Sequence, residues 1–80
     1  RKAAEQGLSQ AQYNLGRMYT EGEGVTQDNA EALKWWRKAA EQGDADAQTN
    51  LGVMYARGEG VAEDFVLAHM WVNLARAQGT

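Results

Sequence analysis

Arg1-Lys2-Ala3-Ala4-Glu5-Gln6-Gly7 opens the chain, and the same heptapeptide returns as residues 37–43. The two copies are offset by 36 residues, and this offset also relates Gly22-Glu23-Gly24-Val25 to residues 58–61. All nine glycines of the chain fall in columns of this repeat. A fixed period between about 20 and 50 residues is the signature of an architecture built from stacked repeats. The repeat therefore decides the fold, and function has to be sought where its two copies differ.

Each unit is predicted to form a helix, a glycine-rich loop and a second helix. The leading helix of the first unit is expected from Ser9 to about Thr20. Its apolar residues recur at helical spacing and define a core face. In the two units this face consists of Ala11, Leu15, Met18 and Tyr19, and of Ala47, Leu51, Met54 and Tyr55. The chain contains no proline, so no proline interrupts the predicted helices.

The second helix of each unit has a recognisable start and end. Asp28 is a good N-cap, and Glu31 three residues later is expected to complete a capping box. This helix should run to about Gln42, with Gly43 following its end. Its inward residues are predicted to be Ala32, Trp35, Ala39 and Ala40. Asp64 and Asp44 are expected to cap the two later helices.

A glycine within each leading helix also needs a physical reason. Gly16 and Gly52 occupy one column, and a glycine inside a helix costs about 1 kcal/mol relative to alanine. We expect a bulky side chain to lie against each of them, from the column of Trp35 and Trp71.

The motifs Ala-x-x-x-Leu-Gly-x-Met-Tyr, Gly-x-Gly-Val and Ala-x-x-Trp-x-x-x-Ala-Ala-Glu-Gln-Gly resemble the Sel-1-like repeat, a relative of the tetratricopeptide repeat, whose unit is about 34 residues. The resemblance implies an all-α protein, a right-handed α–α solenoid with a 36-residue period. Residues 1–80 would form one domain, with 1–7 as the remnant of a preceding second helix, 8–43 as repeat one and 44–79 as repeat two. The resemblance also implies a non-catalytic adaptor, often bacterial, that binds a protein or peptide partner.

Composition argues against several other functions. The chain has no cysteine, one histidine (His69) and one serine (Ser9), so it lacks the partners for a nucleophile–base pair or a metal centre. We therefore expect no enzyme activity, no metal and no cofactor. A net charge of −3 argues against nucleic acid as a partner. No apolar run reaches the roughly 18 residues of a membrane span. The chain is expected to begin inside a repeat, so the compartment stays open between cytoplasm and periplasm or secretion.

The polar face of the leading helices is the first candidate binding surface. In solenoids of this kind the leading helices line the concave side, and the residues predicted to face the groove are Asn14, Arg17, Asn50, Val53 and Arg57. Asparagine amides both donate and accept hydrogen bonds, which suits an extended peptide backbone. Arginines pair with a partner's carboxylates. The alternative is an ordinary solvated face.

The last helix is the second candidate surface, because it departs most from its repeat mate. Phe65, Leu67, Met70 and Leu74 replace the polar residues Asn29, Glu31, Lys34 and Lys38. Apolar side chains left in water forgo about 25 cal/mol per Å², so this face is expected to be covered. The cover would be a further C-terminal element, a neighbouring repeat or a second chain. A homo-oligomerisation module is thus the alternative to a peptide-binding adaptor.

Overall fold

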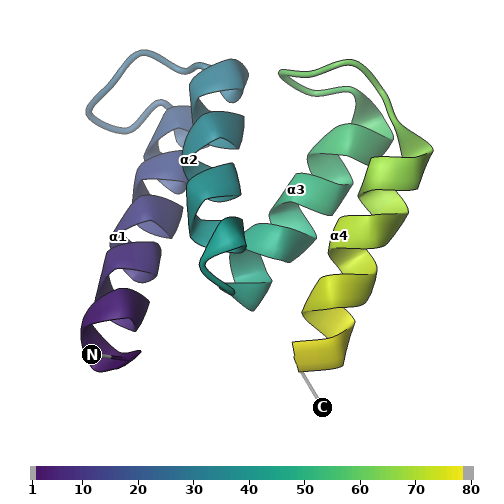
Figure 1. Ribbon diagram of the computed structural model, residues 1–80. Helices are drawn as coiled ribbons and strands as arrows, with labels where there is room; N and C mark the ends of the chain where they lie inside the picture. Colours follow the sequence, from purple (N-terminus) through teal and green to yellow (C-terminus); the bar gives the residue numbers. More distant parts are fainter. Residues whose placement is uncertain (1, 79–80) are drawn as a thin grey trace.

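The structure, a computed structural model, describes the backbone of residues 2–78 and the side chains of residues 8–78. Within this range the chain forms helices and no strand, in two antiparallel helical hairpins placed side by side (Figure 1). The helices are α1 (Lys2–Glu21), α2 (Asn29–Glu41), α3 (Ala45–Arg57) and α4 (Phe65–Gln78). In the centre, α2 packs against α3 and so joins the two hairpins. The predicted all-α solenoid fold is confirmed.

The predicted N-caps form, but the predicted capping box does not. Asp28 Oδ1 accepts hydrogen bonds from the backbone N–H groups of Ala30 (3.0 Å) and Glu31 (3.2 Å). The backbone N–H of Asp28 donates to the carbonyl of Tyr19 at 2.9 Å, so it is not left for the Glu31 carboxylate to accept. That carboxylate lies instead 3.9 Å from Lys34 Nζ.

The first helix is longer than predicted. It begins at Lys2 and passes through Gly7 without a break, whereas the equivalent Gly43 leaves the helix with φ +97°. The difference lies in the next residue. Asp44 caps α3 by accepting from the backbone N–H of Ala47 at 3.0 Å, but Leu8 has no acceptor with which to begin a new helix. The assignment of residues 1–7 to a preceding repeat stays a prediction.

The two repeats bury the same columns to different degrees. In α3 the predicted core residues Ala47, Leu51, Met54 and Tyr55 are all buried. In α1 the expected core face is wrong in part, because Ala11 is exposed and Leu15, Met18 and Tyr19 are only half-buried. The cause is position in the stack: α3 packs against both α2 and α4, whereas α1 packs mainly against α2.

The bulky residues opposite the helix glycines are Trp36 and Val72, not Trp35 and Trp71. A Cβ on Gly16 would collide with the Trp36 indole, and a Cβ on Gly52 would lie 2.5 Å from Val72 Cγ2. Trp36 Nε1 donates to the carbonyl of Tyr13 at 2.9 Å. The two rings stack with centroids 6.1 Å apart. α1 and α2 therefore approach closely through glycine.

Polar bonds join the repeats beneath the apolar core. Gln48, which is buried, donates from Nε2 to the carbonyl of Ala40 at 3.1 Å and accepts from Gln78 Nε2 at 2.7 Å. Arg37 Nη2 of α2 donates to the Tyr55 hydroxyl of α3. These contacts set the position of the second repeat on the first, and hence the shape of the space between them.

Candidate protein-binding site

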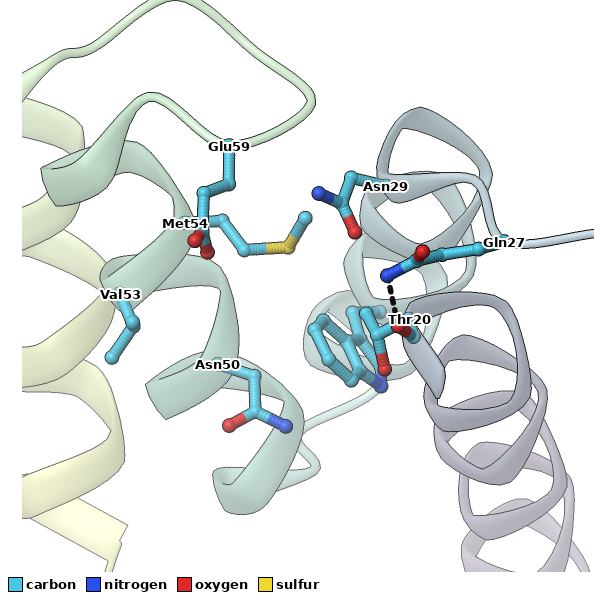
Figure 2. A pocket seen from close by; sticks show the side chains of 8 residues that line it. Thr20, Gln27, Asn29, Asn50, Val53, Met54 and Glu59 are labelled. Carbon is cyan, nitrogen blue, oxygen red and sulfur yellow. Dashed lines mark hydrogen bonds between the residues drawn. The ribbon is translucent and has the colours of Figure 1, made fainter. Parts of the chain in front are cut away.

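A hollow of about 310 Å³ lies at the junction of the two repeats (Figure 2). The end of α1, the following loop, α2, α3 and the second glycine-rich loop all contribute to its wall. The lining residues are Thr20, Gln27, Asn29, Trp36, Asn50, Val53, Met54 and Glu59. The hollow thus depends on the contact between repeats and not on either repeat alone.

The wall of the hollow combines amides, apolar side chains and one carboxylate. The Met54 side chain extends from α3 towards Asn29 on α2, and Glu59 lies above it on the loop (Figure 2). Gln27 Nε2 is held by the carbonyl of Thr20 at 2.8 Å. The amides of Asn29 and Asn50 therefore lie on either side of the apolar Met54 side chain (Figure 2), and a few polar groups around an apolar centre are typical of ligand pockets.

A glycine positions Glu59 over the hollow. Gly60 has φ +71°, and a Cβ there would lie 2.6 Å from the carbonyl carbon and oxygen of Asn29. The loop of the second repeat can rest on the start of α2 only because residue 60 has no side chain. The repeat-equivalent Gly24 has only one side-chain atom near such a Cβ, at 3.7 Å.

The structure separates the residues that the sequence predicted as one groove. Asn50 and Val53 line the hollow. Asn14 and Arg17 line another, of about 170 Å³, on α1. Arg57 lies exposed in the last turn of α3 and lines neither of the two hollows. Asn14 and Asn50 thus line different hollows, and the asparagine ladder stays a prediction.

Arg17 is also engaged within its own helix. Its Nη2 lies 3.7 Å from the Glu21 carboxylate, and both side chains are about half exposed. Such surface pairs contribute less than about 1 kcal/mol, so Arg17 remains available to an incoming partner.

Sequence reasoning missed the residues that reach the hollow from α2 and from the loops. Asn29 was considered only as the polar counterpart of Phe65, and Glu59 only as part of the repeated Gly-Glu-Gly motif. The glycine at residue 60 was the available signal, because a residue without a side chain allows its loop to approach the neighbouring repeat closely.

The apolar surface of α4 is present but differs by one residue from the prediction. Phe65, Val66, Met70 and Leu74 are exposed by 66%, 79%, 42% and 44%. Leu67 is instead half-buried and packs against the core. Val66, which the predicted set omitted, is the most exposed of these four side chains.

The sequence model of the Sel1 repeat matches residues 9–44 and 45–80. The chain belongs to the Sel1 repeat family. Sel1 repeat proteins are generally scaffolds for protein–protein interaction and are typically non-catalytic. The predicted family and its general role are therefore confirmed.

Two solved structures share the fold of this Sel1 repeat chain. One is a protective antigen present in uropathogenic Escherichia coli strains and displaying an SLR fold. It is 51% identical in sequence and matches with a TM-score of 0.89, over 98% of this chain and 17% of the antigen chain. The other is a Sel1 repeat protein from Oxalobacter formigenes, 40% identical, with a TM-score of 0.87 over 90% of this chain and 30% of its own. No curated protein matches. The Sel1 repeat chain thus spans less than a third of either solved relative.

Two further observations concern the described part of this Sel1 repeat chain. None of its helices is both long and apolar enough to cross a membrane. In the same residues, no three histidine or acidic side chains are grouped as they would be around a metal ion.

Proposed function

We propose that the chain is a non-catalytic scaffold that binds an extended segment of a partner protein in the hollow between its repeats. The observation that carries this proposal is the composition of the hollow, in which Asn29 and Asn50 lie on either side of the Met54 side chain and Val53 lies beyond Asn50 (Figure 2). An asparagine amide offers a donor and an acceptor to a peptide backbone without reading its sequence. Met54, which is buried in the core, lines the hollow and supplies its apolar wall.

The charge of the hollow favours a basic segment. Glu59 is the one acidic residue among those lining it, and its carboxylate forms no ion pair with another described residue. A lysine or arginine of the partner would place its aliphatic stem along Met54 and its charge beside Glu59. We propose Asn14, Arg17 and Arg57 as more distant contacts for acidic residues of the same partner.

The experiment is a selection of phage-displayed random peptides on the intact chain, followed by titration of each selected peptide. We expect enrichment of basic and apolar residues. Asn50→Ala and Glu59→Gln should each weaken binding by about 5- to 10-fold, the loss typical of a moderately important interface residue. Asn73→Ala is the matched control, because Asn73 is an exposed asparagine of α4 that does not line the hollow. Peptides that bind Asn50→Ala and Glu59→Gln as tightly as the parent, or a selection without enrichment, would refute the proposed site.

A further inference from the structure

The hollow on α1 is the repeat equivalent of one half of the hollow between the repeats. Repeat two contributes four residues to the hollow between the repeats, namely Asn50, Val53, Met54 and Glu59. Each of them has its 36-residue counterpart in the hollow on α1, which is lined by Asn14, Arg17, Met18, Glu21 and Glu23. Asparagine, methionine and glutamate are the same in both copies, and only arginine and valine differ. The same half-site thus occurs twice along the chain.

The two hollows differ in the wall that faces this half-site. The hollow on α1 has a volume of about 170 Å³, and its lining residues lie on α1 and on the loop after it. The hollow between the repeats has about 310 Å³, and Asn29 and Trp36 of α2 add a second wall. The hollow on α1 is therefore a shallower version of the same site, with Met18 half-buried where Met54 is buried.

Both hollows favour a positively charged side chain. In the hollow on α1, Arg17 Nη2 lies 3.7 Å from the Glu21 carboxylate, so these two charges largely offset each other. The Glu23 carboxylate forms no ion pair with another described residue. It has the same position in its repeat as Glu59, which is also without an ion pair among the described residues. Each hollow therefore retains about one negative charge, on the glutamate of its loop.

We propose that the two hollows act together as a bipartite site, which binds two basic residues of one extended partner segment. This inference rests on the function proposed above, and it adds the number and spacing of the recognised residues. One lysine or arginine lies beside Glu59 and the second beside Glu23. In each hollow the aliphatic stem packs on the methionine and the charge meets the glutamate. Arg17 remains for an acidic residue elsewhere in the segment.

The arrangement of the helices sets the spacing of the two basic residues. The two leading helices, α1 and α3, both pack on α2 (Figure 1). Since packed helices lie about 8–10 Å apart, the two half-sites are separated by about 10–20 Å. An extended chain advances about 3.3 Å per residue, and its side chains alternate between two faces. Basic residues four or six positions apart would both point into the hollows, whereas a spacing of three or five would turn one of them away.

The test starts from a selected peptide that has one basic residue and binds less tightly to Glu59→Gln. Lysine replaces, one at a time, each residue three to six positions away on either side of that basic residue. Calorimetric titration of the intact chain should show binding that is about 3- to 10-fold tighter for a spacing of four or six on one side. This is the range of an exposed ion pair together with packing of the lysine stem. Spacings of three and five have the same composition and should give a smaller gain.

Variants of the chain locate the second lysine. Glu23→Gln should remove the gain from the second lysine and leave binding of the one-lysine peptide unchanged. Glu41→Gln is the matched control, because Glu41 is an exposed glutamate of α2 that lines neither hollow. It changes the net charge equally and should preserve the gain. Circular dichroism checks that each variant folds like the parent.

The outcomes separate this inference from the function on which it rests. The bipartite site is refuted if no spacing tightens binding, if all spacings do so equally, or if glutamate in place of the second lysine tightens binding as much. It is also refuted if Glu41→Gln removes the gain as fully as Glu23→Gln, because attraction to the net charge of −3 would then suffice. In each of these cases the dependence of the one-lysine peptide on Glu59 still supports the hollow between the repeats. Loss of that dependence refutes the proposed function itself.

Discussion

Replacing Gly16 by alanine is expected to destabilise the chain, although alanine is the better helix former. In a helix interior with free space, the replacement would stabilise by about 1 kcal/mol. Here the added methyl group would occupy the position of the Trp36 indole. That ring cannot move freely, because its Nε1 is bonded to the carbonyl of Tyr13 and its face stacks on the Tyr13 ring.

The magnitude follows from three effects. Overpacking costs about 1–3 kcal/mol, and loss of the Trp36 hydrogen bond costs about 0.5–1.5 kcal/mol. The gain of about 1 kcal/mol in helix propensity opposes both. The net loss should be about 2 kcal/mol, which for a domain of this size lowers the Tm by about 10 °C.

The assay is urea unfolding followed by circular dichroism, at one fixed protein concentration because any self-association adds to apparent stability. The control is the same Gly16→Ala change in a Trp36→Ala background. Without the indole, alanine at position 16 should stabilise by up to about 1 kcal/mol. If Gly16→Ala leaves the parent chain unchanged or more stable, the close approach of α1 and α2 is refuted.

Two further pairs of replacements compare the repeats directly. Gly60→Ala should destabilise by about 2–4 kcal/mol, because the cost of a positive φ adds to the cost of overlap with the Asn29 carbonyl. Gly24→Ala should incur only the backbone cost of about 1–2 kcal/mol. Thermal melts that show equal destabilisation for the two variants would contradict the contact between the loop and α2. Gln48→Ala should cost about 1–3 kcal/mol, because it removes the hydrogen bonds from Gln48 Nε2 to the Ala40 carbonyl and from Gln78 Nε2 to Gln48 Oε1, each worth about 0.5–1.5 kcal/mol. Gln12 makes an exposed side-chain hydrogen bond, so Gln12→Ala should cost less than about 1 kcal/mol. Equal losses of unfolding free energy for the two variants in urea titrations would show that Gln48 does not help to hold the repeats together.

Sequence reasoning succeeded where the signal is local or periodic. The caps at Asp28, Asp44 and Asp64 act on backbone groups two or three residues away, so their neighbours in sequence suffice to identify them. It failed where the contacts of a side chain depend on how one helix is rotated against another. Trp35 and Trp36 are adjacent and equally apolar, and only the packing of α2 on α1 selects Trp36 as the side chain that meets Gly16.

The candidate site was less accessible to prediction for the same reason. Periodicity placed Asn50 and Val53 on the correct face of α3, because that inference needs one helix only. It placed Asn14 beside them on the assumption that the equivalent faces of α1 and α3 adjoin. The polar bonds at Gln48 and Tyr55 instead set α3 against α2. The hollow therefore draws Asn29 and Glu59 from elements that the pattern of the leading helices does not include.

The difference between the repeats also bears on why α4 has an exposed apolar surface. Core columns such as Leu15 and Leu51 are identical in both units, so stacking does not require the outer columns to change. The changes from Lys34 and Lys38 to Met70 and Leu74 fall on one edge of one helix, where they add exposed apolar surface without filling the described core. Such a change has no benefit to the stability of this chain alone, because the free energy of apolar burial is gained only when water is excluded. These side chains become stabilising only where a surface outside the described residues excludes water from them.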